Sequence, residues 1–146
     1  MNTFQKLAVL FVAAVVLGSS HASRAQDYYK MKMLMRLDTG DVIVALNDSS
    51  VSADFAALLP LTAVFKDYAG AEKITYLPRE LNTTGAEEFH DVTGDFAYYA
   101  PWGNLAVFYK GSGRASGLYI LGRIESGKEI LAAQKGDFAA SLEIIE

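Results

Sequence analysis

Short apolar runs separated by turn residues recur along this chain, and they limit the possible folds more than any other feature. In the first run, residues 31–37, three methionines and a leucine alternate with other residues, which is the period of a strand with one buried face. Thr39-Gly40 then predicts a hairpin turn. The runs predict eight strands, at residues 31–37, 42–46, 61–66, 72–77, 96–99, 105–109, 118–124 and 138–144. The last three runs before the C-terminal strand have the pattern of consecutive antiparallel strands.

Residues 51–59 have helical spacing instead. Val51 and Phe55 lie four residues apart, and Leu58 and Leu59 continue the same apolar face. Ser49 or Ser50 is expected to cap the N-terminus of this helix, and the proline that follows it is expected to end it.

A second short helix is predicted near the C-terminus. Ser126 and Glu129 form a capping box, the helix continues through Leu131, and Gly136 is placed to end it. The long stretch 78–94 has no periodicity and is expected to be a loop. So many short strands would expose many edges unless the sheet closes, so we predict a mainly β fold with two short helices, a closed antiparallel β-barrel.

The first 25 residues have the pattern of a cleavable secretory signal. Lys6 supplies the positive charge, residues 7–17 are apolar, and a stretch of small residues leads to a cleavage site after Ala25, with Ala22 as the second choice. The apolar run is shorter than the roughly 20 residues that span a bilayer. We therefore expect an exported protein, periplasmic or secreted, with one domain at 26–146 and no stable membrane span after cleavage.

Charge and cysteine content exclude several classes of function. Removing residues 1–25 takes away Lys6 and Arg24 but no acid, so the net charge moves from −4 to −6. Such an acidic domain repels phosphate backbones, and nucleic acid is not an expected partner. The chain has no cysteine, so disulfides, thiol redox chemistry and thiolate metal ligands are excluded. Packing alone must therefore hold the domain together.

Three stretches resemble the cyclophilin barrel. Residues 44–59, VALNDSSVSADFAALL, resemble its strand leading into the first helix; residues 103–109, GNLAVFY, resemble its core strand; and residues 121–131, LGRIESGKEIL, resemble its turn into the second helix. More closely, DFAALLPLT, LPREL, GDFAYYAPWGNLAVFYK and LGRIESG together resemble the bacterial cyclophilin-like family of small domains, whose activity is not established. This resemblance covers nearly the whole mature chain and implies a closed cyclophilin-like β-barrel.

Cyclophilins are peptidyl-prolyl isomerases, in which an arginine donates hydrogen bonds to the twisted peptide beside a glutamine, a histidine and an apolar proline pocket. The resemblance places Phe108 at a pocket phenylalanine. It places Ala106 at the glutamine, Leu118 at the histidine and Asp91 at the arginine. An acid cannot replace the arginine as a donor, so the resemblance implies the fold and Phe108 but leaves the catalytic residues unassigned.

An aromatic turn at residues 98–104 is the most unusual segment, because it holds the only tryptophan, Trp102, beside two tyrosines. Aromatic side chains in a loop can stack on a proline, a sugar or a planar ligand. The alternative interpretation is that Trp102 plugs one end of the barrel.

Two arginines in loops, Arg79 and Arg114, are candidates to meet at a common anionic or carbonyl group. The alternative is that both are solvated surface side chains. The predicted ligand-binding groove consists of Tyr76, Arg79, Tyr99, Trp102, Phe108 and Arg114.

No metal or cofactor is predicted. Glu87, Glu88, His90 and Asp91 lie close together in the long loop, but metal ligands usually come from separate elements and acidic loops are usually hydrated. The glycine-rich stretch 111–117 lacks the Lys-Ser/Thr pair of a phosphate-binding loop and is interpreted as a hairpin connection.

Three functional hypotheses follow. The leading one is an exported cyclophilin-like domain that binds an extended peptide or small ligand in a groove on the barrel, without efficient isomerase activity. The second is a peptidyl-prolyl isomerase with a non-standard active site, in which Arg79 is the best substitute for the missing arginine. The third is a non-catalytic subunit of an envelope assembly. A peptide, a protein or a small molecule is the expected partner, and the oligomeric state is left open.

Overall fold

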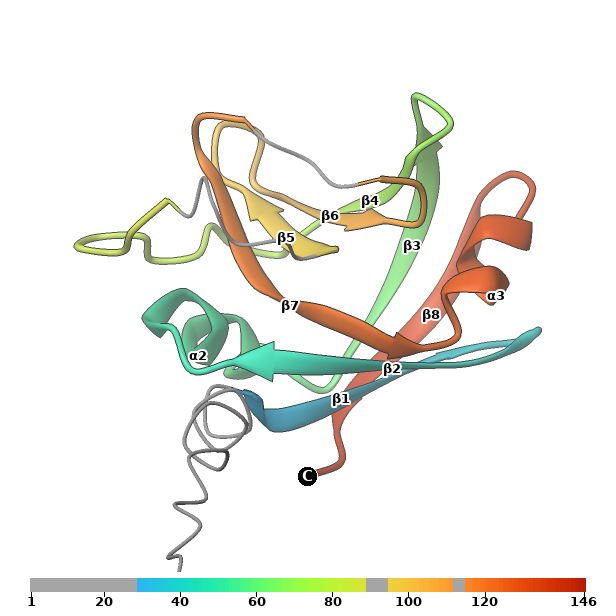
Figure 1. The fold of residues 1–146 in the computed structure, drawn as a ribbon, viewed down its shortest axis with the longest axis horizontal. Helices are drawn as coiled ribbons and strands as arrows, with labels where there is room; N and C mark the ends of the chain where they lie inside the picture. The colour runs from blue at the N-terminus through green and yellow to red at the C-terminus, as the bar shows by residue number, and fades with distance from the viewer. Residues whose placement is uncertain (1–28, 89–94, 112–114) are drawn as a thin grey trace, which may run out of the picture.

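The computed structural model describes residues 29–88, 95–111 and 115–146, and within them eight strands close into an antiparallel barrel (Figure 1). The strands are β1 (Tyr29–Leu37), β2 (Gly40–Asn47), β3 (Leu61–Tyr68), β4 (Glu72–Tyr76), β5 (Phe96–Tyr99), β6 (Asn104–Phe108), β7 (Leu118–Ser126) and β8 (Phe138–Ile144). The helices are α2 (Ser50–Ala56) and α3 (Lys128–Ala133). The predicted fold, a mainly β closed antiparallel barrel with two short helices, is confirmed.

Strand order around the barrel differs from the order along the chain. The order is β1-β2-β7-β5-β6-β4-β3-β8, so β5 lies between β6 and β7, and β6 pairs on its other side with β4. The expectation that β5, β6 and β7 are consecutive neighbours is therefore only partly correct. The pairing of β4 with β6 has a functional consequence, because it carries the β3–β4 hairpin to the side of the barrel that holds the aromatic turn.

The interior of the barrel is filled by apolar side chains from both helices and from every strand except β4, whose buried Lys73 and Thr75 are polar. Phe55 of α2 and Leu131 of α3 are fully buried in this cluster. The two helices lie on opposite sides of the barrel (Figure 1). The ring of Phe55 packs 5.6 Å from that of Phe96, centroid to centroid. Burial of a large apolar side chain stabilises the fold by roughly 2–3 kcal/mol, so Val51 and Phe55 hold α2 against the core and Leu131 holds α3.

The start of α2 follows the sequence signal. The Ser49 hydroxyl accepts a hydrogen bond from the backbone N–H of Ser52 at 3.1 Å, which makes Ser49 the N-cap. The helix ends at Ala56, and the apolar residues 58 and 59 continue into the turn before β3.

The start of α3 does not follow the predicted capping box. Ser126 is the last residue of β7, the N-cap is Gly127 with φ 89°, and no side chain caps the helix. A Cβ on Gly127 would lie 2.5 Å from the backbone oxygen of Asp41, so close contact with β2 determines where the helix begins. Gly136, with φ 77°, lies beyond the end of α3 in the turn before β8.

Several predicted features fall in segments that the structure does not describe. The predicted signal at residues 1–25 lies outside the described residues, and so do His90, Asp91 and Arg114. None of the helices in the described part of the chain is long and apolar enough to cross a bilayer.

Candidate functional site

A second apolar cluster lies on the outer face of the barrel. Alternation along β6 directs Leu105 and Val107 into the interior, so Ala106 and Phe108 face outward. They are joined by residues from β5 and β7, and this cluster consists of Ala97, Ala106, Phe108, Leu118 and Ile120, with Tyr99 packed against it. An apolar patch on the outer face must be shielded from water, and the aromatic turn at residues 98–104 lies beside it.

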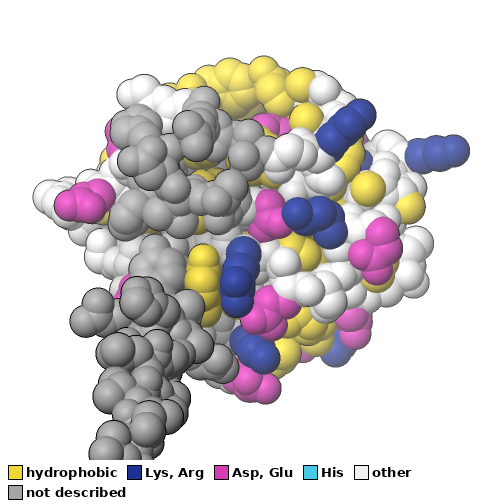
Figure 2. All heavy atoms as spheres, in the orientation of Figure 1, with side chains coloured by type: hydrophobic (Ala, Val, Ile, Leu, Met, Phe, Trp, Pro, Cys, Tyr) yellow, Lys and Arg dark blue, Asp and Glu magenta, His cyan; other side chains and the backbone are white. Residues whose placement is uncertain are grey.

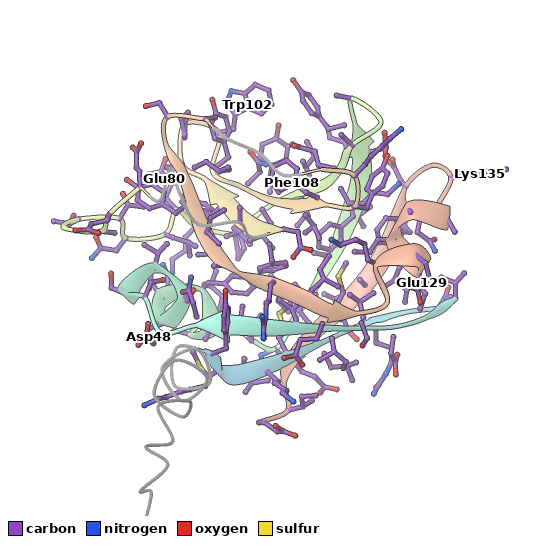
Figure 3. The ribbon with its side chains drawn as sticks, in the orientation of Figure 1. Asp48, Glu80, Trp102, Phe108, Glu129 and Lys135 are labelled. Carbon is purple, nitrogen blue, oxygen red and sulfur yellow. The ribbon has the colours of Figure 1, made fainter. Side chains whose placement is uncertain are left out.

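A pocket of about 280 Å³ opens over this cluster. Its lining comes from β3, β4, β5, β6, β7 and the adjoining turns, and consists of Tyr68, Glu72, Tyr99, Trp102, Ala106, Phe108, Ala115 and Leu118. In Figure 2, hydrophobic atoms gather at the top edge of the molecule, on the side where the β5–β6 turn lies in Figure 1. Figure 3 shows Trp102 at that turn and Phe108 lower down, on β6.

Three aromatic rings form the outer wall of the pocket. The Trp102 ring lies 5.7 Å from Tyr68 at 83° and 5.5 Å from Tyr99 at 75°, both edge-to-face arrangements that aromatic pairs favour. The turn is tight, because the Gly103 N–H donates to the Tyr99 carbonyl at 2.9 Å while Gly103 has φ 68°. Trp102 is 49% exposed on the outer surface, so it does not plug the end of the barrel.

Glu72 is the only charged side chain among the described lining residues. It pairs across the hairpin with Tyr68 and on its other side with Phe108, so the carboxyl group stands between aromatic neighbours. Burial raises the pKa of the Glu72 carboxyl above its usual value, and no cation in the described residues opposes that shift.

Asn104 carries a buried acceptor without a partner in the described residues, on the same outer face of β6. It is the first residue of β6, two positions before Ala106, and it pairs with Tyr99 of β5. Its side chain is 1% exposed; Nδ2 donates to the Leu105 carbonyl at 2.9 Å, whereas Oδ1 has no hydrogen-bond partner in the described residues. Buried acceptors are usually hydrogen-bonded, so the unpaired Oδ1 atom of Asn104 marks a position that is not optimised for stability.

Of the six predicted site residues, the structure brings Tyr99, Trp102 and Phe108 together in this pocket. Tyr76 is exposed two positions beyond Ile74 on β4, where the Lys66 ammonium lies 5.6 Å from its ring centroid, and it is not among the lining residues.

Arg79 is held away from the lining by α2. Its Nη1 and Nη2 atoms each donate to a carboxylate oxygen of Asp54 at 2.9 Å, and Nη1 also donates to the Glu80 carbonyl at 3.1 Å. Asp54 accepts a further bond from the Asn82 N–H at 2.8 Å. These bonds to Arg79 and to the backbone lower the pKa of the Asp54 carboxyl from 3.8 to about 2. Arg79 therefore ties the loop after β4 to α2.

Sequence reasoning missed Tyr68 and Glu72. Both lie beside the turn at Ala69-Gly70, and the hairpin places them directly opposite each other, which the sequence already indicates. Their position beside Phe108 depends on the pairing of β4 with β6, which no local sequence pattern predicts. Within the described residues, no group of three histidine, aspartate or glutamate side chains is placed to hold a metal ion.

The strand order, the two inserted helices and the outer pocket define a class of small closed barrels, and comparison with known proteins gives the family. A profile of the cyclophilin-like family matches residues 35–143, and the chain belongs to that family. A solved structure of a hypothetical protein from Archaeoglobus fulgidus is similar, with a TM-score of 0.57 and 18% identity, covering 79% of this chain and 95% of that one. At that identity the likeness concerns the fold alone. Among curated proteins, none matches this sequence.

Proposed function

We propose that this chain is an exported cyclophilin-like domain that binds an extended peptide or a small ligand in the outer pocket, without efficient isomerase activity. The observation that carries the proposal is the half-exposed Trp102 standing over an apolar pocket between two tyrosines. Ligand pockets usually begin at roughly 300 Å³, so a volume of about 280 Å³ suits a single side chain or a small headgroup. Export is supported by the signal pattern in the first 25 residues.

The composition of the pocket supports binding rather than isomerisation. The resemblance to cyclophilins places Ala106 at the glutamine, Leu118 at the histidine and Phe108 at the pocket phenylalanine, and all three line this one pocket. The apolar contact is therefore retained, while the two polar positions carry aliphatic side chains. Arg79, the best substitute for the catalytic arginine, is bonded to Asp54 instead.

A fluorescence titration tests the binding proposal directly, because Trp102 is the only tryptophan of the chain. The purified protein is titrated with a panel of proline-containing peptides, sugars and small metabolites. We expect at least one probe to shift the emission saturably, and Phe108→Ala to weaken that probe about tenfold through loss of a buried aromatic contact. A panel that leaves the emission unchanged would contradict the proposal.

A protease-coupled isomerisation assay separates this proposal from the isomerase alternative. We expect proline isomerisation at the uncatalysed rate. Catalysis that Arg79→Ala abolishes would establish the isomerase instead. Export is tested separately by sequencing the N-terminus of the protein recovered outside the cytoplasm, where we expect a chain that begins at residue 26, or at residue 23 if the second-choice site is used.

A further inference from the structure

We infer that the outer pocket selects an organic cation, a ligand whose positively charged nitrogen carries alkyl groups. This inference rests on the proposed function, because it assigns a chemical class to the ligand of that same pocket. Two features of the pocket carry it, the aromatic wall and the unpaired carboxylate of Glu72.

The aromatic wall favours a cation over an anion. The Trp102 ring packs at steep angles against Tyr68 and against Tyr99, and all three rings line the pocket. Phe108 adds a fourth ring to the lining. The faces of aromatic rings are negative, and sets of such rings bind alkylammonium groups, whose methyl groups also make apolar contacts. An anion in the same place would meet repulsion.

Glu72 supplies the negative charge that such a ligand neutralises. Its carboxyl lines the pocket, is partly buried, and makes no ion pair with any lysine or arginine in the described ranges. A partly buried charge without a partner costs free energy, and its raised pKa reflects that cost. A ligand that brings a positive charge would remove the cost on binding.

Within the described residues, no basic side chain near the pocket is paired with Glu72. The Asn104 Oδ1 atom, an acceptor without a donor in the described residues, belongs to the same outer face of β6 but lies outside the pocket lining. Lys66 lies over Tyr76, Arg79 is bonded to Asp54, and Lys110, whose backbone N–H donates to the Ala71 carbonyl beside Glu72, makes no ion pair with that carboxyl. The described lining is thus acidic and aromatic.

Three probes of nearly equal shape and different charge test the inference: choline, 3,3-dimethyl-1-butanol and 3,3-dimethylbutyrate. Each is titrated into the purified protein by calorimetry and by Trp102 emission. We expect choline to bind about tenfold more tightly than the neutral alcohol, and the carboxylate to bind most weakly. Equal binding of choline and the alcohol, or no detectable choline binding, would overturn the inference.

Two variants show whether Glu72 is the cause of the preference. Glu72→Gln is expected to remove most of the preference for choline over the alcohol. Glu129→Gln makes the same change of charge on α3, away from Trp102 and Phe108 (Figure 3), and is expected to keep the preference. A preference that survives in Glu72→Gln would refute the role assigned to this carboxylate.

The outcomes also separate this inference from the proposed function. If peptides or metabolites shift the Trp102 emission while choline does not, the pocket binds a ligand and the cation inference alone fails. If no compound of either panel shifts it, both fail. A peptide that carries trimethyllysine, compared with choline, then distinguishes a polypeptide source of the cation from a free one, and tighter binding of either supports the inference.

Discussion

The hydrogen-bonded pair of Asp54 and Arg79 allows the clearest quantitative prediction, because its geometry and its electrostatic effect are both defined. Asp54→Asn keeps the shape of the side chain and removes its charge. The Asp54 pKa falls from 3.8 to about 2 on folding, and each pKa unit corresponds to about 1.4 kcal/mol. Full linkage would therefore be worth roughly 2.5 kcal/mol. Because Arg79 is 46% exposed and Asp54 25% exposed, solvent screening reduces the expected loss to about 1 kcal/mol.

The stabilisation by the Asp54–Arg79 pair should decrease as the pH falls. The folded-state pKa of Asp54 lies below its value of 3.8, so the stabilisation is complete above about pH 4 to 5 and is lost as the pH falls through about 2. The gap in unfolding free energy between the parent protein and Asp54→Asn should therefore be constant from pH 7 to pH 5 and should narrow toward pH 3. In urea, a loss of about 1 kcal/mol lowers the midpoint by roughly 0.5–1 M.

A double-mutant cycle isolates the pair. Arg79→Ala, Asp54→Asn and the double variant are unfolded in urea at pH 7, with Trp102 emission as the signal. We expect a coupling energy of about 1 kcal/mol, and a larger loss in Asp54→Asn than in Arg79→Ala, because only the former also affects the bond from the Asn82 N–H. Additive losses, or a gap that stays constant down to pH 3, would refute the reasoning and leave Arg79 available for a ligand.

Other predictions concern the packing of the barrel, and urea unfolding measures each of them. Phe55→Ala should cost about 3–5 kcal/mol, since the side chain is fully buried and anchors α2; a loss below about 1 kcal/mol would contradict that role. Gly122→Ala should cost about 3 kcal/mol, because the added Cβ would lie 2.2 Å from the Ala45 carbonyl oxygen and force β2 and β7 apart; an unchanged midpoint would show that the strands yield freely. Lys73→Met should cost about 1–3 kcal/mol by removing the ammonium that donates to the Gln134 carbonyl at 2.9 Å, and a stabilised variant would count against this bond.

Much of the fold was accessible from local patterns. Each strand predicted from apolar runs is present within a few residues of its expected ends, because a period of two reports directly on which side chains are buried. The N-cap of α2 was predicted as Ser49 or Ser50, and the structure selects Ser49, whose hydroxyl accepts a hydrogen bond from the N–H three residues later. The predicted start of α3 was wrong, because a neighbouring strand determines it. Gly127 caps α3, since β2 passes too close to this position for any side chain.

In the candidate site, too, some residues follow from the sequence and others only from the tertiary structure. The sequence determined by itself that Tyr99 and Trp102 stand together at a turn and that Phe108 lies at the end of a core strand. Only the tertiary structure decided that Glu72 lines the same pocket and that Arg79 donates its hydrogen bonds to Asp54. The physical reason is that strand alternation and capping act over a few residues, whereas the pairing of β4 with β6 and the bond from the loop to α2 join residues about 25 to 36 positions apart.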